Sequence, residues 1–305
     1  MRDPELLYTI DEDVAAGLRG GTEPTLVHLL RGFIDAGSAG QLASEHLREQ
    51  FEPRRLVTFD IDELLDYRSR RPTMTFDATR WSAYEEPELA IDVLRDVEGV
   101  PFLLLHGSEP DIRWESWVAA MRQIVERFAV PLTIGAHGIP MGVPHTRPIS
   151  VTAHGSRPEL VTGHPSWFGT VQVPASASAL LEYRLGGWGH DALGFAVHVP
   201  HYVAQSGYPR AALAALEHVE RATGLELGSA RLESAATATA GEIDEQVSAS
   251  PEIGAIVHAL EEQYDAYAGS TARASLLSAD IPTADELGAE FERFLAQQDG
   301  DPSGG

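Results

Sequence analysis

Two segments rich in histidine and proline hold the side chains of this chain that are best suited to chemistry. They cover residues 137–148 and 194–209. Each follows an apolar run, so we expect each at the exit of a strand, where ligand and partner sites gather in open α/β sheets. Their prolines predict rigid loops that form no regular strand pairing. The imidazole, guanidinium and phenol groups that they present belong to His137, His145, Arg147, His198, His201 and Tyr202.

The histidines admit two chemical interpretations, metal ligation and hydrogen bonding. A zinc site needs three or four imidazoles or carboxylates that converge on one point. His198 and His201, with Pro200 between them, do not form the HxxxH pair that a helix presents. We therefore interpret the histidines as hydrogen-bonding groups and expect neither a metal nor a cofactor. Asp60 and Asp62 follow an expected strand, and we interpret Asp62 as a helix cap in preference to a ligand of a divalent cation.

An arginine cluster stands out in a chain that is otherwise rich in acids. Arg68, Arg70 and Arg71 lie close together, and guanidinium groups bind phosphate or carboxylate through two parallel hydrogen bonds. The cluster therefore allows a site for a small anion. The alternative is that these arginines form ion pairs with acids of the same chain or of another subunit.

The composition bounds the class of protein. The chain has 305 residues, of which 43% are hydrophobic, enough for one large core with an appendage. Its formal net charge of -24 repels a phosphate backbone, so we expect no nucleic-acid partner. No apolar stretch approaches the roughly 20 residues of a membrane span, and the acidic N-terminus does not resemble a signal peptide. We expect a cytoplasmic protein with no membrane partner.

The absence of lysine and cysteine from the sequence excludes several mechanisms. All 22 basic residues are arginine. A chain without lysine forms no Schiff base and has no P-loop lysine, and a chain without cysteine has neither disulfides nor thiolate catalysis. The sequence also lacks the G-x-S-x-G and G-x-G-x-x-G motifs. We assign no catalytic residue, which favours a binding role and leaves enzymatic activity an open question.

Strand and helix patterns alternate through most of the chain. This alternation predicts an α/β fold with a mostly parallel sheet and helices on both of its faces. The expected strands cover residues 25–33, 55–59, 101–106, 131–136, 149–153 and 193–199, and the expected helices cover 38–51, 114–128, 175–184 and 209–221. Ser38 is the expected cap of the first of these helices.

Beyond residue 227 the pattern is helical throughout. We expect helices over residues 253–264 and from Pro282, the second with an apolar stripe of Leu287, Phe291 and Leu295. The chain is accordingly divided into four parts. These are an N-terminal extension (1–24), an α/β domain (25–227), a helical appendage (228–296) and a disordered tail (297–305).

Further distinctive segments follow one another in a fixed order along the chain. They cover residues 32–37, 59–62, 66–72, 103–114, 152–155 and 163–165. With the two segments described first, they resemble the PAC2 family, named after proteasome assembly chaperone 2, and above all its actinobacterial branch. The resemblance extends over roughly residues 25 to 225. We therefore add Asp35, Arg68, Arg71 and Glu109 to the candidate ligand or interface residues.

The resemblance implies a three-layer αβα sandwich similar to that of purine nucleoside phosphorylases, and homo-oligomers, a trimer among them. Eukaryotic and archaeal members of the family assist the assembly of proteasome α-rings, some of them through a C-terminal hydrophobic-Tyr-any tail. This chain ends in Asp301-Pro-Ser-Gly-Gly305 and has no such tail, so docking by that route is not expected.

Two hypotheses of function follow from the sequence. The first is a non-catalytic, oligomeric protein that binds other proteins, proteasome subunits being candidates, through the two histidine-rich loops and the acidic appendage. The second is an enzyme or sensor for a small anionic ligand such as a nucleoside or sugar phosphate. In that case Arg68, Arg71 and Arg147 would hold the anion, and His145 or His201 would transfer a proton near neutral pH.

Overall fold

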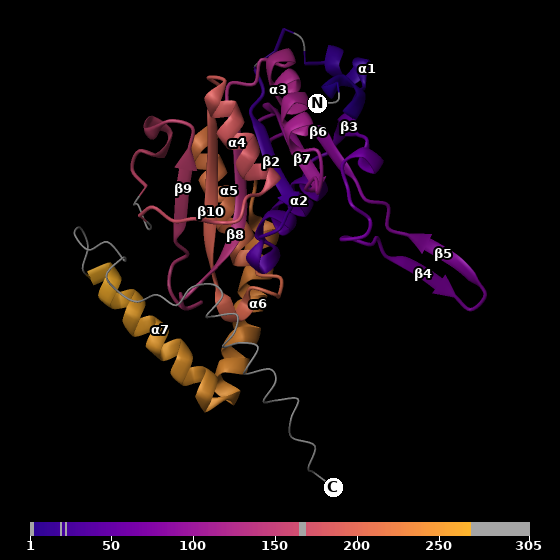
Figure 1. The fold of residues 1–305 in the computed structure, drawn as a ribbon. Helices are drawn as coiled ribbons and strands as arrows, with labels where there is room; N and C mark the ends of the chain where they lie inside the picture. The colour runs from indigo at the N-terminus through magenta and orange to yellow at the C-terminus, as the bar shows by residue number, and fades with distance from the viewer. Residues whose placement is uncertain (1–2, 19, 22, 165–168, 270–305) are drawn as a thin grey trace.

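An eight-stranded mixed sheet forms the centre of the protein, and helices cover both of its faces (Figure 1). The computed structural model describes residues 3–18, 20–21, 23–164 and 169–269. The strands are β1 (Tyr8–Ile10), β2 (Leu26–Arg31), β3 (Arg54–Phe59), β4 (Met74–Asp77), β5 (Arg80–Tyr84), β6 (Leu89–Arg95), β7 (Pro101–Ser108), β8 (Thr133–Met141), β9 (Val151–Gly155) and β10 (Ala192–Pro200). The α-helices are α1 (Glu12–Ala16), α2 (Ala39–Gln50), α3 (Trp114–Arg127), α4 (Ala177–Gly187), α5 (Pro209–Thr223), α6 (Ala230–Ala249) and α7 (Pro251–Gly269). Short 3-10 turns are η1 (Pro4–Leu7), η2 (Ala36–Ser38), η3 (Ile61–Glu63), η4 (Pro158–Val161) and η5 (His201–Val203).

The sheet is parallel in its centre and antiparallel at its edges. Its strand order is β1-β3-β6-β7-β2-β8-β10-β9, in which β7, β2, β8 and β10 run parallel to one another. Strands β1, β3 and β6 on one side and β9 on the other pair antiparallel to their neighbours. The expectation of a mostly parallel sheet therefore holds for the central four strands only. Because these four share a direction, the loops after β7, β2, β8 and β10 all leave the same edge of the sheet.

Two apolar cores lie on opposite faces of the sheet, which confirms the α/β fold. Alternate residues of β2 divide between them, since Val27 and Leu29 join one core and Leu26 and Leu30 the other. Helices α2, α5 and α6 cover the first face, whereas α1, α3 and α4 cover the second. Strands buried on both faces explain the continuous apolar runs in the sequence. The likeness to purine nucleoside phosphorylases stays a prediction.

Most expected helices and strands occur within a few residues of their predicted bounds, but the two histidine-rich segments begin differently. The first was expected to start as a loop, whereas β8 continues through Pro140 to Met141. The second begins inside the strand expected over residues 193–199, which β10 extends to Pro200. Two adjacent parallel strands pair along this whole length, with Met141 opposite Pro200. Prolines are tolerated here because they lie at the ends of the strands, where the ladder has few bonds left to lose.

The chain contains strands that the sequence did not reveal. Strand β6 is almost entirely buried between β3 and β7, although its Asp92 interrupts the apolar pattern. The segment expected to be an N-terminal extension supplies η1, β1 and α1, and β1 pairs with β3 at the edge of the main sheet. The helix expected from Pro282 and the tail over 297–305 lie outside the described residues.

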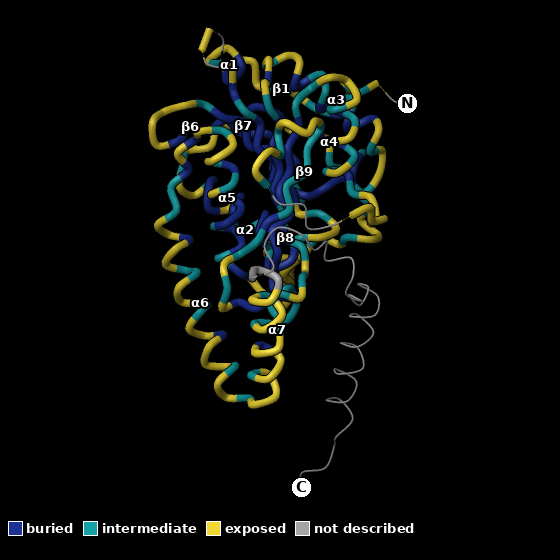
Figure 2. The backbone as a smooth tube through the Cα atoms, turned by 90° about the vertical axis from the view of Figure 1, so that its left-hand side faces the viewer, coloured by how far each residue is buried: buried dark blue, intermediate teal, exposed yellow. Residues whose placement is uncertain are grey.

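Two structures, the β arm and the helical arm, project from the body (Figure 1). The β arm is the two-stranded hairpin of β4 and β5, in which every residue of both strands is exposed. The helical arm consists of α6 and α7, a hairpin that extends beyond the strand-exit edge of the sheet, away from the β arm (Figure 1). Figure 2 shows α7 and the distal part of α6 as largely exposed, in contrast to the buried strands of the sheet. Within the described residues, no helix is long and apolar enough to cross a membrane.

The N-terminal turn offers a test of whether residues before β2 belong to the core. Leu7 is fully buried against α3, whereas the neighbouring Leu6 is 62% exposed. Replacing Leu7 with alanine leaves a cavity and should lower the free energy of unfolding by about 2–5 kcal/mol in chemical denaturation. The matched variant Leu6→Ala should lower it by less than about 0.5 kcal/mol. Equal effects of the two variants would contradict this placement of η1.

Candidate functional site

The two histidine-rich segments meet at the carboxyl edge of the sheet, because they extend from paired parallel strands. Backbone bonds also join the loop after β2 to the turn after β10, with Gly37 N–H donating to Ala204 (2.7 Å) and Tyr208 N–H donating to Gly37 (2.8 Å). Gly37 has a φ of 65°, a left-handed conformation that favours glycine. Three strand-exit loops are thus joined into one surface, as their order in the sheet requires.

His145 forms the centre of a hydrogen-bonded group that links four segments. The Tyr202 hydroxyl accepts the backbone N–H of His145 (2.7 Å) and lies 2.6 Å from its ring Nδ1. Ring Nε2 lies 3.1 Å from Oδ1 of Asp244 on α6. All of these atoms are satisfied when the hydroxyl donates to Nδ1 and the protonated Nε2 donates to Asp244. Arg210 of α5 also donates to the carbonyl of His145 (2.5 Å), and burial raises the pKa of the Tyr202 hydroxyl to about 12.

The loop between β8 and β9, here called the anchor loop (residues 142–150), fastens the helical arm through charged groups. Arg147 binds Asp265 of α7 through two parallel hydrogen bonds of 2.8 and 2.6 Å and reaches Glu261 at 3.2 Å. Thr146 donates to Glu261 (2.5 Å), and the hydroxyl of Tyr264 donates to the carbonyl of Pro148 (3.1 Å). These carboxylates hold the pKa of the Arg147 guanidinium above its ordinary value. Arg147 therefore binds acids of its own chain.

Few apolar contacts supplement this polar attachment of α7. Among residues 251–266, whose side chains are described, Val257 alone is buried. By contrast, α6 contributes Leu232 and Ile243 to the core beneath α5. The first helix of the arm is thus part of the core, whereas the second is held to the body chiefly by the anchor loop.

Asp35 joins the loop after β2 to its surroundings by accepting backbone N–H groups. Its carboxylate accepts from Gly40 (2.9 Å) and Gln41 (3.0 Å) at the start of α2, and from Gly138 in β8 (3.0 Å). Burial raises the pKa of this carboxyl, and the N–H groups oppose the rise. Ser38, the expected helix cap, has a φ of 51° and makes no capping bond, so Asp35 caps α2 in its place.

Glu109 does the same for the loop after β7. One carboxylate oxygen accepts the N–H of Phe33 (3.1 Å), and the other accepts the N–H of Ser178 in the first turn of α4 (3.0 Å). A side chain at position 32 would collide with this carboxylate, because a Cβ on Gly32 would lie 2.8 Å from Oε2. Both family-derived residues, the half-buried Asp35 and the buried Glu109, are therefore acceptors for backbone groups in this structure.

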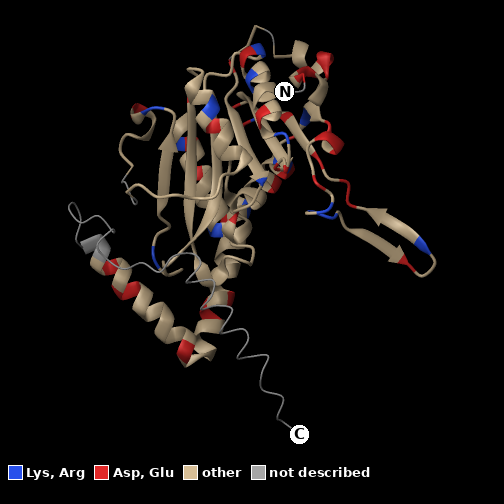
Figure 3. Ribbon diagram, viewed as in Figure 1, with Lys and Arg blue, Asp and Glu red and all other residues tan. Residues whose placement is uncertain are grey.

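The arginine cluster divides between two environments. Arg70 contacts Asp111 through its guanidinium and donates to the carbonyls of Arg31 (3.1 Å) and Glu109 (2.5 Å). Arg68 and Arg71 are exposed at the base of the β arm, and no ion pair of either is found among the described residues. Figure 3 shows this basic base of the β arm on the opposite side of the molecule from the anchor loop. The structure thus does not bring Arg68 and Arg71 together with Arg147.

Burial lowers the pKa of the remaining candidate histidines, His198, His137 and His201. Burial lowers the pKa of His198 to about 4, and its Nε2 lies 2.8 Å from the hydroxyl of Thr152. Burial likewise lowers the pKa of His137 to about 4, with a smaller contribution from His154. The pKa of His201 is lowered by burial too, and its ring packs against Tyr202 at 5.4 Å between centroids. No set of three or more potential ligands in the described part of the chain has an arrangement that could hold a metal ion.

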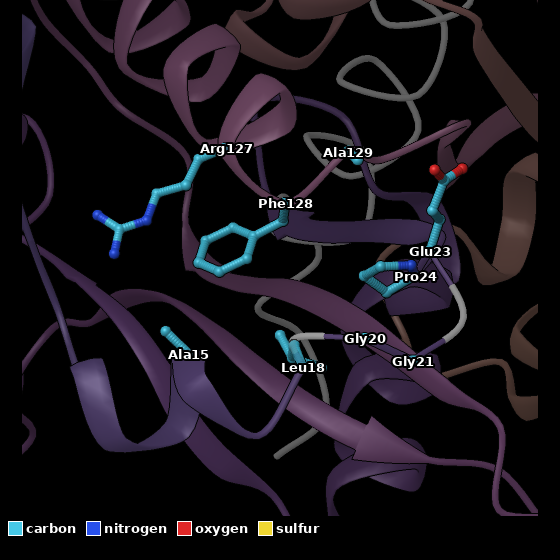
Figure 4. Close-up of a pocket in the computed structure, with 9 residues that line it drawn as sticks. All are labelled: Ala15, Leu18, Gly20, Gly21, Glu23, Pro24, Arg127, Phe128 and Ala129. Atoms are coloured by element: carbon cyan, nitrogen blue, oxygen red, sulfur yellow. The ribbon is translucent and has the colours of Figure 1, made fainter.

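A pocket of about 300 Å³ lies at the opposite, amino-terminal edge of the sheet (Figure 4). It is lined in part by Leu18, Pro24, Arg127 and Phe128. Its one arginine is already paired, since Arg127 binds both carboxylate oxygens of Glu12 at 2.7 and 2.8 Å. The other charged residue of the lining is the acid Glu23, so the pocket offers no free positive charge to an anion. The candidate site remains the surface at the strand exits.

Several participants in this surface were not singled out in the sequence. Asp244, Glu261 and Asp265 belong to helices that were characterised only as acidic, although the spacing of Glu261 and Asp265 places them on one helix face. The β arm was missed because its turn has no glycine. Ala78 adopts the left-handed conformation there, with a φ of 51°.

Comparisons with known proteins agree on the family. The sequence pattern described as the PAC2 family matches residues 29–247. A solved Mycobacterium tuberculosis protein of unknown function is 45% identical, with 96% of each chain covered and a TM-score of 0.81. A Corynebacterium glutamicum protein of unknown function is 37% identical, with 88% of this chain and 100% of that chain covered and a TM-score of 0.80. A proteasome-assembly chaperone homologue of M. tuberculosis shares the fold, at 24% identity, 76% and 99% coverage and a TM-score of 0.70. No curated protein matches the chain.

The attachment of α7 by Arg147 can be tested directly. Replacing Arg147 with alanine should increase the rate of amide hydrogen exchange in α7 about two- to fivefold, the range expected for a partly exposed ion pair. The core helices α2 and α5 should be unaffected. Arg157→Ala is the matched control. Arg157 donates two short hydrogen bonds, of 2.6 and 2.5 Å, to the carboxylate of Asp191, and this pair lies away from α7. Equal exchange in α7 of both variants would contradict the attachment.

Proposed function

The chain belongs to the PAC2 family, and from this premise we propose that it is a non-catalytic, self-associating protein that binds another protein in the manner of a proteasome-assembly chaperone. The relative described as a proteasome-assembly chaperone homologue supports this choice of partner class. The observation that carries the proposal is that both projections of the protein present apolar side chains to solvent.

The β arm is the better candidate for self-association. Its aromatic and sulfur-containing side chains are 47–63% exposed, and they are Met74, Phe76, Trp81 and Tyr84. Phe76 and Trp81 pack edge to face, with centroids 5.1 Å apart. An isolated two-stranded hairpin is only marginally stable in water, and an exposed aromatic cluster of this kind marks a contact surface. The tip of the arm carries one positive and one negative side chain, Arg80 and Asp77, so the tips of two copies do not repel each other.

The helical arm suits a different protein. Ile253 and Ile256 of α7 are 40% and 51% exposed. The described part of α7 contains acidic residues and neither lysine nor arginine, as the coloured ribbon of Figure 3 shows. Two copies of so acidic a surface would repel each other, whereas a partner with apolar and basic groups would be attracted. The anchor loop sets the position of this surface relative to the strand exits.

The alternative of a small anionic ligand has less structural support. Arg147 is occupied by Asp265 and Glu261, and Arg68 and Arg71 lie on the other side of the sheet. The imidazole of His145 is held by Tyr202 and Asp244. An enzyme or sensor of this kind stays a prediction from the sequence, and the protein-binding role is the one that we develop.

Self-association through the β arm predicts a specific loss of assembly. The variant Trp81→Ala with Phe76→Ala should reduce the native mass in light scattering toward the 33.0 kDa of one chain, because the exposed aromatic cluster is removed. Tyr183→Ala is the matched control, since Tyr183 is an aromatic residue of α4 that is 72% exposed outside the arm. An unchanged mass for the double variant would show that assembly uses another surface.

Partner binding by the helical arm predicts the outcome of quantitative affinity purification from the native host. The intact chain should recover one other protein in stoichiometric amount, with proteasome α subunits the leading candidates. A chain that ends at residue 250 keeps α6 in the core. The amount of partner that it recovers should be lower by more than about tenfold, the effect of losing one binding hot spot. Undiminished recovery by the shortened chain would overturn the assignment of the helical arm.

A further inference from the structure

Four residues in adjacent strands form a row of two histidines and two glycines across the sheet. His28 of β2 pairs with Gly135 of β8, Gly135 pairs with Gly194 of β10, and Gly194 pairs with His154 of β9. All four positions face the side of the sheet that α3 and α4 cover, since the residues next to them in the strands join the opposite core. His137 lies on the same face, two positions beyond Gly135.

The two glycines leave the space that the imidazole rings occupy. A Cβ on Gly135 would lie 2.1 Å from Cε1 of His28, and a Cβ on Gly194 would lie 2.2 Å from Cε1 of His154. Both rings therefore extend sideways over the neighbouring strand, toward each other. The ring of His137 lies 6.4 Å from that of His154, so three imidazoles share one compartment. We call the three histidines His28, His137 and His154 the histidine row.

The compartment holds little negative charge to balance protons. Glu182 of α4 lies 2.8 Å from Nδ1 of His154 and is the acid that contacts the row. The titratable groups placed at this compartment are His28 of β2, His137 of β8, His154 of β9, His198 of β10 and Glu182 of α4, whereas Arg184 of α4 pairs with Glu115 and Tyr183 is 72% exposed. Those of α3 are engaged elsewhere, Glu115 with Arg184 and Arg122 with Glu126. One carboxylate thus faces three imidazoles that repel one another once charged.

Burial keeps the imidazoles of His28 and His137 neutral near pH 7. It lowers the pKa of His28 and of His137 to about 4, and the nearby His154 adds to the effect. A histidine whose folded pKa lies below its ordinary 6.5 contributes stability that is present above pH 6.5 and is lost as the pH falls toward 4. Acid therefore favours any opened state in which water reaches the rings.

We propose that the histidine row is a proton-sensitive release for α4 and β9, a regulatory device built into the second face of the sheet. Helix α4 is the layer that a charged row would displace, because it covers this face through the buried Ala177, Leu181 and Leu185 and its Glu182 contacts His154. Its first turn is tied by Glu109 to the loop at Phe33, so release of α4 also frees part of the strand-exit surface. The device does not depend on which partner that surface binds.

Hydrogen exchange of the intact chain at pH 7.5 and pH 5.5, corrected for intrinsic rates, tests the proposal. Protection of α4 and β9 should fall at pH 5.5 by about tenfold for each of His28 and His137, as a pKa change from 6.5 to about 4 requires. Helix α3, which packs on the same face without histidine, should change less than about twofold. An equal loss in α3, α4 and β9 would overturn the proposal, because it would indicate global acid unfolding.

Variants of the row separate this mechanism from general acid sensitivity. His28→Gln together with His137→Gln keeps polar side chains but removes two protonation sites, and should abolish most of the pH effect on α4 and β9. His258→Gln is the control, because His258 lies on α7 and is 71% exposed. Should the double variant fail to fold, His137→Gln alone should make the loss of protection between pH 7.5 and pH 5.5 about tenfold smaller. A pH effect on α4 that persists unchanged in a folded row variant contradicts the proposal.

Discussion

The carboxyl edge of the sheet depends on two carboxylates that accept backbone N–H groups from distant segments. Asp35 ties the loop after β2 to α2 and β8, and Glu109 ties the same loop to β7 and α4. Backbone groups buried at strand exits need partners, because an unpaired group costs about 1–3 kcal/mol. The parallel centre of the sheet brings the loops together, and these two acids fix their positions. Asp35 and Glu109 lie in two of the segments that resemble the PAC2 family. Their structural role accounts for these two residues, whether or not a ligand binds nearby.

This rigid edge carries two projections with different chemistry. The base of the β arm is fixed through Arg70, which binds Asp111 and the carbonyl of Glu109 beside the loop that Glu109 holds. The helical arm is fixed at the other side through Arg147 and its acids on α7. Charged side chains therefore position both arms, while the apolar side chains of the arms remain in solvent. This division explains how a chain with a net charge of -24 can still present apolar contact surfaces.

The sequence predicts the central strands and their helices well, because strands buried on both faces give continuous apolar runs. It misses β6, whose buried Asp92 is compensated by Arg55 and His106 from neighbouring strands, a pairing that no local pattern reveals. It places each of the two histidine-rich segments at a strand exit but cannot show that the segments meet or that Tyr202 and His145 touch. The interpretation of Arg147 as an anion ligand did not foresee its ion-pair partners, since Asp265 is more than a hundred positions away in the sequence. Ion pairs over such separations depend on topology, which periodicity alone does not supply.

The central claim is that the two arms, and not a pocket for a small ligand, are the contact surfaces of this protein. A photo-reactive amino acid placed at Trp81, at Ile256 or at the control position Tyr183, followed by cross-linking in the native host, tests it most directly. We predict cross-links to a second copy from Trp81, cross-links to a different protein from Ile256, and few from Tyr183. Equal cross-linking from all three positions, or none from either arm, would contradict the account.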